Sequence, residues 1–353
     1  MPKTLSELTG QAISDVKCSA FESRGFSGSN NHMLAVETNQ GLGSRYIIKQ
    51  VSLAWDWIMR ASNDQKAREV ALMEWGLVDR LPPEIRHPLV ACFRDGPVAG
   101  FLMHDISPTI MPNHEQPISK EDNAFLLDAM AAQHMAFWQM PFPADDPLGL
   151  IPLNQFIQML SHRTARREID GNPESVAYIV AQRYLIGWDL VPELLASDVA
   201  DIVYQLTEDP QPLCHAMERY PKTLLHGDWW VNNMGLVRSP KHQLFLLDWQ
   251  AATQSVPAVD LARYLTKQHY CLPISRESAI ESYRQSLAQR LGNRYDDGWW
   301  QPQLDLGLLT DFVRCICFLA WNAAHCPNRT VATSAKQDVD WLAEHARTAI
   351  RWL

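Results

Sequence analysis

The sequence predicts an α+β protein of two lobes, in which a small β-rich lobe precedes a larger, mainly helical one. Short β-rich runs and turn residues dominate residues 18–105. Long helical patterns take over beyond residue 107, and one compact β-like segment, residues 224–250, interrupts them. We therefore place residues 1–103 in the first lobe and residues 104–353 in the second, with a short hinge between them.

The first lobe should contain a β-hairpin. Residues 33–36 and 46–53 are β-rich runs, and the turn-forming residues 39–43 separate them.

One helix should follow the hairpin. Residues 62–64, Ser-Asn-Asp, can cap its start, and the proline pair 82–83 ends it. The apolar side chains that recur at helical spacing in between are Val70, Met73, Leu77 and Leu81. Glu69 lies about 40° from Met73 around such a helix, at the border of the buried stripe. A charge in that position needs a partner.

The second lobe should be built from long helices around the β-like segment. Helical patterns cover residues 123–139, 154–206, 275–291 and 304 to the end. Within the segment, four consecutive large apolar residues precede Asp248, which predicts a buried strand that presents this carboxylate at its exposed end. We therefore expect three polar side chains to converge at the mouth of one site, namely Asp228, Asn233 and Asp248.

Composition excludes several classes of protein. The chain of 353 residues carries a net charge of −9 and no Lys/Arg run, which argues against nucleic acid as a partner. Its seven scattered cysteines suggest reduced thiols and no zinc site. The N-terminus lacks a signal segment, and Asp311 and Arg314 interrupt the most apolar stretch, residues 308–321. We expect a soluble cytoplasmic enzyme with no membrane partner.

Phosphoryl transfer explains why one site would combine Asp228, Asn233 and Asp248. A carboxylate can orient an attacking hydroxyl and take its proton, while an amide oxygen and a second carboxylate hold Mg²⁺ on nucleotide phosphates. Hard oxygen ligands are the ones that Mg²⁺ prefers.

The sequence His226-Gly227-Asp228, with Asn233 five residues later and Asp248 fifteen residues beyond that, resembles a known catalytic core. It is similar to the core of the aminoglycoside phosphotransferase, choline kinase and ecdysteroid-kinase-like superfamily, and most similar to the last group. The resemblance implies a protein-kinase-like fold and an ATP-dependent phosphotransferase that acts on a hydroxyl of a small molecule, with ATP and Mg²⁺ as cofactors. By position, Asp228 matches the catalytic base, and Asn233 and Asp248 match the metal ligands.

The same resemblance implies roles for residues that support these groups. His226 matches the residue that braces the catalytic loop, and Asp260 matches a carboxylate that holds this loop in place. In the first lobe, Lys49 resembles the strand lysine that grips the α- and β-phosphates, and Glu69 resembles its helix partner. The residues expected to contact the nucleotide are Lys49, Glu69, Gly28, Ser29 and Asn30 of the phosphate-covering loop, and His104 and Ile106 of the hinge that meets adenine.

One position departs from protein kinases. They have a lysine two residues after the catalytic Asp, and here that residue is Trp230. The departure favours small substrates and leaves the group that compensates charge unnamed. If Trp229 and Trp230 line the acceptor site, the acceptor should present an apolar or aromatic face or a cationic amine. The alternative is that both rings belong to the core.

Two other functions remain open at this stage. A non-catalytic pseudokinase would bind nucleotide without transferring phosphate, which the intact set of Lys49, Asp228, Asn233 and Asp248 disfavours. A metal-dependent hydrolase would use His226 with Asp228 and Asp248, but it needs a histidine-rich metal shell that the sequence lacks. The sequence does not name the acceptor, which could be an amino alcohol, an antibiotic, a steroid-like alcohol or another metabolite. It also leaves open the oligomeric state and the choice between ATP and GTP.

Overall fold

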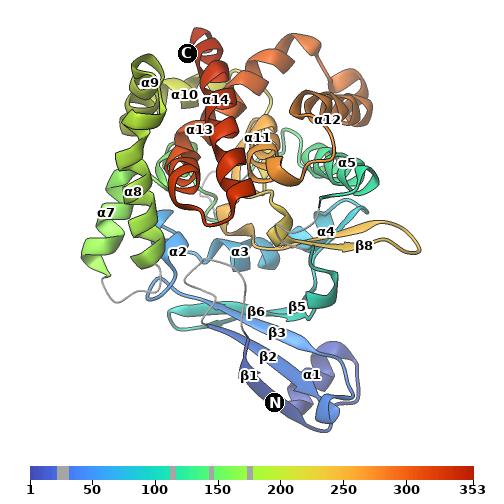
Figure 1. The fold of residues 1–353 in the computed structure, drawn as a ribbon. Helices are drawn as coiled ribbons and strands as arrows, with labels where there is room; N and C mark the ends of the chain where they lie inside the picture. The colour runs from blue at the N-terminus through green and yellow to red at the C-terminus, as the bar shows by residue number, and fades with distance from the viewer. Residues whose placement is uncertain (22–31, 112–116, 143–146, 173–177) are drawn as a thin grey trace.

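The computed structural model describes residues 1–21, 32–111, 117–142, 147–172 and 178–353, and it has the α+β architecture expected from the sequence (Figure 1). A small antiparallel sheet forms one end of the molecule and a larger group of helices forms the other. The N-terminus lies at the sheet end and the C-terminus lies at the far end of the helices. Within the described residues, no helix combines the length and the apolar character needed to cross a bilayer.

The sheet of the first lobe has five strands in the order β1-β2-β3-β6-β5. Their bounds are Val16–Ala20 for β1, Met33–Thr38 for β2, Tyr46–Val51 for β3, Leu89–Asp95 for β5 and Val98–His104 for β6. The predicted hairpin is β2 and β3, in which Met33 pairs with Lys49. Helix α1 (Pro2–Thr9) packs on this sheet through Leu5, which belongs to a small core with Val36 and Tyr46.

The prediction of one helix after the hairpin is wrong. The segment forms three short helices, α2 (Trp57–Ala61), α3 (Arg68–Glu74) and α4 (Leu77–Arg80). The Asp64 carboxylate accepts hydrogen bonds from the backbone N–H groups of Lys66 and Arg68, so the cap turns the chain rather than starting a helix at once. Gly76, with a φ of 88°, then separates α3 from α4. Val70, Met73 and Leu77 are nevertheless buried and Leu81 is half-buried, which is why the apolar spacing did not reveal the breaks.

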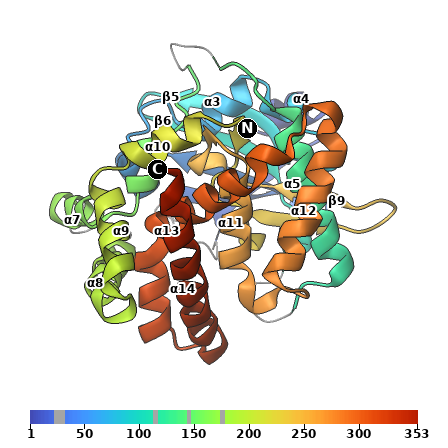
Figure 2. The same ribbon diagram turned by 90° about the horizontal axis from the view of Figure 1, so that it is seen from above.

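The helical lobe is organised around α13, whose 29 residues are buried along most of their length. Seen from above, α13 and α14 lie in the middle, with α8 and α9 on one side and α11, α12 and α5 on the other (Figure 2). The pattern at 154–206 is divided among four helices, and the pattern beyond 304 between two. The helices are α5 (Lys120–Ala136), α6 (Leu153–Gln158), α7 (His162–Gly171), α8 (Tyr178–Leu194), α9 (Ser197–Glu208), α10 (Gln211–Glu218), α11 (Ala258–Lys267), α12 (Arg276–Leu291), α13 (Asp297–His325) and α14 (Arg329–Ala349).

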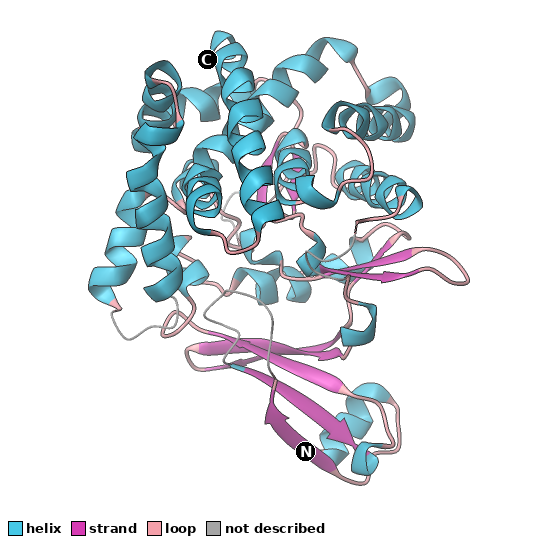
Figure 3. Cartoon of the chain, viewed as in Figure 1, coloured by secondary structure: helices cyan, strands magenta, loops and turns pink. Residues whose placement is uncertain are grey.

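Short strands lie beside the helices and hold the β-like segment predicted at residues 224–250 (Figure 3). They are β4 (Ile85–Arg86), β7 (Thr223–Leu225), β8 (Met234–Val237), β9 (Gln243–Leu246) and β10 (Thr253–Ser255). Strand β7 pairs with β10, and β9 pairs with both β8 and β4. As predicted, the strand before Asp248 is buried at Leu244 and Leu246. The Leu247 N–H then bonds the Asn233 carbonyl at 2.8 Å, which brings the ends of the two strands together.

Candidate active site

The first cluster of the site joins the two lobes at Lys49. Its ammonium group lies 2.7 Å from Glu69 Oε2 on α3 and 2.8 Å from Asp248 Oδ1 after β9. Glu69 Oε1 accepts a hydrogen bond from the Trp249 N–H, so this carboxylate bridges the lysine and the end of the strand. Glu69, the charged residue at the border of the predicted helix stripe, is therefore paired with Lys49. Burial works to lower the pKa of Lys49, but Asp248 and Glu69 outweigh it, so the lysine stays protonated.

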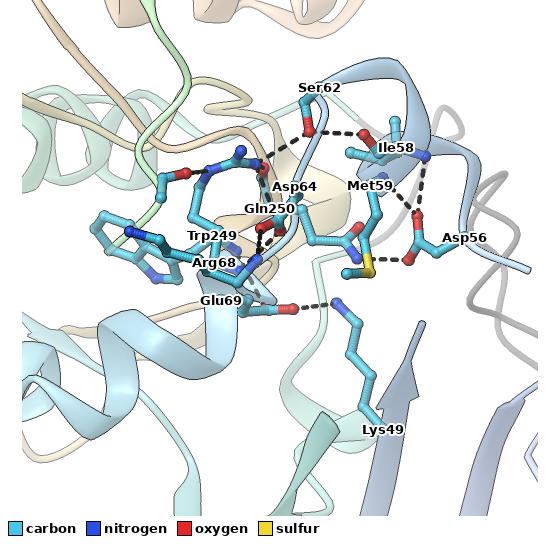
Figure 4. A network of polar contacts seen from close by, with 12 residues as sticks. Lys49, Asp56, Ile58, Met59, Ser62, Asp64, Arg68, Glu69, Trp249 and Gln250 are labelled. Carbon is cyan, nitrogen blue, oxygen red and sulfur yellow. Dashed lines mark hydrogen bonds and ion pairs between the residues drawn. The ribbon is translucent and has the colours of Figure 1, made fainter. Parts of the chain in front are cut away.

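Helix α3 is fixed to the helical lobe by the neighbour of Glu69 (Figure 4). Arg68 is 1% exposed and donates from Nη1 to the carbonyl of Gln250 at 2.6 Å and from Nε to the carbonyl of Gly149. The Gln250 side chain in turn donates to Asp56 Oδ2 at 2.8 Å. Asp56 and Gln250 are buried, where hydrogen bonds are stronger than in water, and this network sets where Glu69 meets Lys49.

Asp260 and His226 hold the loop that carries Asp228. Asp260 on α11 accepts the N–H groups of His226 at 2.9 Å and of Gly227 at 2.8 Å. His226 Nε2 lies 2.8 Å from the Leu247 carbonyl, and its Nδ1 faces the Asp228 N–H. Gly227 has a φ of 79°, and a Cβ there would lie 2.1 Å from the Ala251 carbonyl oxygen, so only glycine fits.

Asp228 itself is bound from two sides. Its Oδ1 accepts a hydrogen bond from Arg263 Nε at 2.8 Å, and its Oδ2 accepts one from Asn233 Nδ2 at 3.1 Å. Burial works to raise the pKa of Asp228, but Arg263, Lys267 and Arg314 outweigh it and hold the pKa well below the usual range. Asp228 is therefore ionised at any physiological pH and can accept a hydrogen bond from a hydroxyl.

Three cations surround Asp228. Arg263 also lies 3.8 Å from Asp311 through Nη1, and Arg314 donates to the Gly227 carbonyl at 2.8 Å. The ammonium of Lys267 lies over aromatic rings instead, 4.5 Å from the ring centre of Trp230 and 3.3 Å from that of Phe318. Burial and the charge of Arg263 lower the pKa of Lys267 to about 7.

The donor set at Asn233 and Asp248 fits Mg²⁺. Asn233 Nδ2 is directed at Asp228, and Lys49 takes Asp248 Oδ1. Within the described residues, Asn233 Oδ1 and Asp248 Oδ2 accept no hydrogen bond, so one amide and one carboxylate oxygen are free to bind a metal. Mg²⁺ on a nucleotide needs only one or two such protein ligands. No cluster of three His, Cys, Asp or Glu side chains suited to a metal occurs in the described part of the chain.

The expected adenine contacts lie at the end of β6. His104 is exposed, and its N–H is already bonded to the Pro88 carbonyl at 2.8 Å. The Ile106 carbonyl accepts from the Thr109 N–H, whereas the Ile106 N–H has no hydrogen-bond partner within residues 32–111 or the other described ranges. Of the expected contacts, the Ile106 N–H is the backbone donor left for a base. Gly28, Ser29 and Asn30 lie outside the described residues.

The two tryptophans after Asp228 differ. Trp229 has no exposed surface and packs edge-on against His226, so it is part of the core and cannot line an acceptor site. Trp230 is half-buried, and Lys267 covers its ring. Its side chain also hydrogen-bonds Tyr270. The suggestion that both rings form the acceptor wall therefore fails for Trp229.

A cavity of about 380 Å³ is lined in part by Tyr270, and we call it the η6–α14 cavity. It opens between the short 3₁₀ turn η6 (His269–Cys271), which follows α11, and the first turns of α14. Its lining consists of His269, Tyr270, Arg329, Thr330, Thr333, Ser334 and Gln337.

Sequence reasoning missed Arg263, Lys267 and Arg314, although a signal was present. Asp260, Arg263 and Lys267 are three and four residues apart, which places them on one face of α11. On α13, Asp311, Arg314 and Phe318 have the same spacing. Two apolar helices with polar residues at matching spacing predict a buried polar interface, and here that interface surrounds Asp228.

Comparison with known proteins agrees with this geometry. Residues 177–293 match the model of the ecdysteroid kinase-like family. No curated protein sequence matches the chain. Among solved structures, a microcompartment-associated aminopropanol kinase aligns with a TM-score of 0.55 and 12% identity over 99% of both chains.

Two further structures align more loosely. The choline kinase LicA from Streptococcus pneumoniae gives a TM-score of 0.48 and 11% identity over 97% of this chain and 96% of its own. The aminoglycoside phosphotransferase APH(2")-IIia, in its GDP and kanamycin complex, gives 0.49 and 13% over 98% of both. The alignment with the aminopropanol kinase, at 12% identity, shows a likeness of fold alone. The resemblance predicted from the sequence is thus confirmed: residues 177–293 match the ecdysteroid kinase-like family, and the chain as a whole has the protein-kinase-like fold of the small-molecule kinases.

Proposed function

We propose that this protein is an ATP-dependent phosphotransferase that transfers a phosphoryl group to a hydroxyl of a small molecule. The observation that carries the proposal is one unbroken series of contacts across the site. Asp228 bonds Asn233, the backbone of Asn233 bonds Leu247 beside Asp248, and Asp248 bonds Lys49, which bonds Glu69. The residues proposed as proton acceptor, metal ligands and phosphate-binding lysine thus follow one another along this series of contacts.

Each residue has a role in this proposal. Lys49 would bind the nucleotide phosphates, and Asn233 and Asp248 would hold Mg²⁺, which supplies neutralisation of phosphate charge. Asp228 would orient the acceptor hydroxyl and accept its proton. A carboxylate with a low pKa is a weak base, which suits a transition state in which the phosphoryl group has largely left its donor before the proton moves. The residues 1–103 would then form the nucleotide-binding lobe, and residues 104–353 would carry the catalytic loop and metal site.

The surroundings of the site fit the proposal. The acceptor would be a small molecule, in keeping with Trp230 at the position where protein kinases have a lysine. All seven cysteines are free, as expected for a cytoplasmic enzyme with access to ATP. A metal-dependent hydrolase has no supporting observation, since the described residues contain no histidine-rich metal cluster.

The test is replacement of Asp228 by Asn with a panel of hydroxylated compounds, scored by ATP-dependent phosphate gain in mass spectrometry. We expect turnover to fall by about 10²–10⁴-fold, the range typical of general-base removal, with nucleotide affinity little changed. Turnover within about threefold of the parent would reject Asp228 as the base. Nucleotide binding without any turnover by the parent protein would favour the pseudokinase.

A further inference from the structure

The ammonium group of Lys267 has no anionic partner. Within the described residues, no carboxylate oxygen lies within 4.0 Å of its Nζ, and its contacts are the rings of Trp230 and Phe318. The residue is neither fully buried nor exposed, and burial of the charged group is the largest cause of its lowered pKa. A cation that has lost much of its water without gaining a counter-ion binds an anion more strongly than an exposed lysine does.

The charges around Asp228 are already matched without Lys267. Arg263 bonds Asp228 directly and lies 3.8 Å from Asp311, which also accepts a hydrogen bond from Thr266. With Arg314 included, three cations face two carboxylates here. An amine on the acceptor would find no free carboxylate and would meet like charge, whereas an oxyanion would find Lys267.

Within the described ranges, the lining of the η6–α14 cavity also has a cation without a carboxylate partner. No carboxylate lines it, and its one arginine, Arg329, forms no ion pair within the part of the chain that the structure describes. Asp338, which contacts the lining residue His269, is 2% exposed and also forms an ion pair with Arg276. The remaining lining supplies hydroxyl and amide groups, which bind the polar body of a small molecule.

The cavity and Lys267 are neighbours. Tyr270 lines the cavity and hydrogen-bonds Trp230, the residue whose ring Lys267 covers. His269 lines it as well and follows Lys267 by two residues. Because Lys267 occupies the face of Trp230, this ring is not free to stack on a cationic amine, which removes one of the acceptor classes suggested by the sequence.

We propose that the acceptor is a hydroxylated anion, that Lys267 binds its oxyanion, and that the η6–α14 cavity holds its polar body. This inference rests on the proposed phosphotransferase function and narrows its substrate class. The oxyanion bound by Lys267 has one other conceivable source, the phosphoryl group in transfer, and the experiment separates the two.

Three matched probes test the charge preference. They are 3-hydroxypropanoate, 3-hydroxypropanamide and (3-hydroxypropyl)trimethylammonium, which share a terminal hydroxyl and differ in the charge of the other end. Brief acetylation of the intact protein at pH 7, read by mass spectrometry, reports how far each probe protects Lys267, with the exposed Lys336 as internal reference. In parallel, each probe is tested as acceptor with MgATP.

We expect hydroxypropanoate to protect Lys267 and to be phosphorylated at least about tenfold more efficiently than the ammonium probe, as expected for one hydrogen bond between charged groups. Lys267→Arg should keep this preference and Lys267→Gln should lose it. Equal protection by all three probes, protection by none, or preference for the ammonium compound would overturn the inference. So would protection by a non-hydrolysable ATP analogue alone, which would assign Lys267 to the transferring phosphoryl group.

The outcomes separate this inference from the proposed function. Protection by the acid without phosphate transfer to any probe or panel compound would leave the anion site standing while the phosphotransferase assignment fails. Transfer to amino alcohols but not to hydroxy acids would leave the phosphotransferase standing while the anionic acceptor fails.

Discussion

The two halves of the site differ in the sign of their excess charge. On the nucleotide side, one lysine, Lys49, contacts two carboxylates, Glu69 and Asp248. On the acceptor side, three cations surround two carboxylates, and Lys267 is left without a counter-ion. In the functions proposed above, the first half would be completed by a cation such as Mg²⁺ and the second by an anion. The comparison teaches that two adjoining halves of one site can carry opposite excess charge when their charged residues are distributed unevenly.

The largest effect should follow from removing the oxygen ligands of the nucleotide half. We expect Asp248→Ala to reduce Mg²⁺-dependent transfer by at least about 10²–10³-fold and Asn233→Ala to weaken it, because each loses an oxygen that would hold the metal. Transfer rates measured across a Mg²⁺ titration check this, with Asp95→Ala, an exposed carboxylate of the first lobe, as the matched control. Unchanged Mg²⁺ dependence in both site variants would put the metal elsewhere.

The pairing of charges in the nucleotide half gives the next prediction. Lys49→Ala and Glu69→Ala should each depress transfer, and the double variant should lose less than the sum of the two losses in free energy. The reason is that Glu69 acts through Lys49, and pairs in contact usually couple by about 0.5–3 kcal/mol. A double-mutant cycle on kcat/KM measures the coupling. Strict additivity would show that the 2.7 Å contact has no part in catalysis.

What the sequence could predict also differs between the halves. Lys49, Glu69 and Asp248 lie on or beside elements with clear local patterns, and the resemblance named them. Burial of Glu69 raises its pKa to about 7 against the pull of Lys49, an outcome that depends on packing which no local pattern contains.

On the acceptor side, the sequence named Asp228 and suggested Trp229 and Trp230, of which Trp229 belongs to the core. Arg263 and Lys267 lie in apolar helical patterns in which a cation usually marks an exposed position, so only the packing of α11 against α13 turns them toward Asp228. The same limit applies to the fold. An apolar stripe continues through Gly76, so its spacing could not show that α3 ends there.

Removing the main partner of Asp228 should change the pH dependence of the acceptor half. Arg263 is a principal reason why the pKa of Asp228 lies below its usual range, and burial opposes it. In Arg263→Gln the pKa of Asp228 should therefore rise. Because only the ionised carboxylate accepts the hydroxyl proton, activity of the variant should fall as the pH drops through the raised pKa, at a pH where the parent stays active.

The Arg263→Lys variant controls for this, since it keeps a cation beside Asp228 and should retain most activity at low pH. Profiles of kcat/KM from pH 5 to 9, with nucleotide affinity as the check on folding, decide the question. Parallel profiles for the parent and Arg263→Gln would mean that Asp228 owes its ionisation to other groups.

The smallest expected effect concerns Lys267 and is the sharpest test of the difference between the halves. The groups that act on its pKa are Arg263, which lowers it together with burial, and Asp228, Cys315 and Asp311, which raise it, with a result of about 7. Lysine is charged below its pKa, so the preference for hydroxypropanoate over its neutral amide should be full near pH 6 and should fall several-fold by pH 8.5. In Lys267→Arg the guanidinium stays charged throughout, so the preference should not change with pH. The ratio of kcat/KM for the two probes cancels any pH dependence of the chemical step, because both probes share the same hydroxyl and the same Asp228. A ratio that stays constant in the parent, or that falls equally in Lys267→Arg, would show that another group sets the charge preference of the acceptor half.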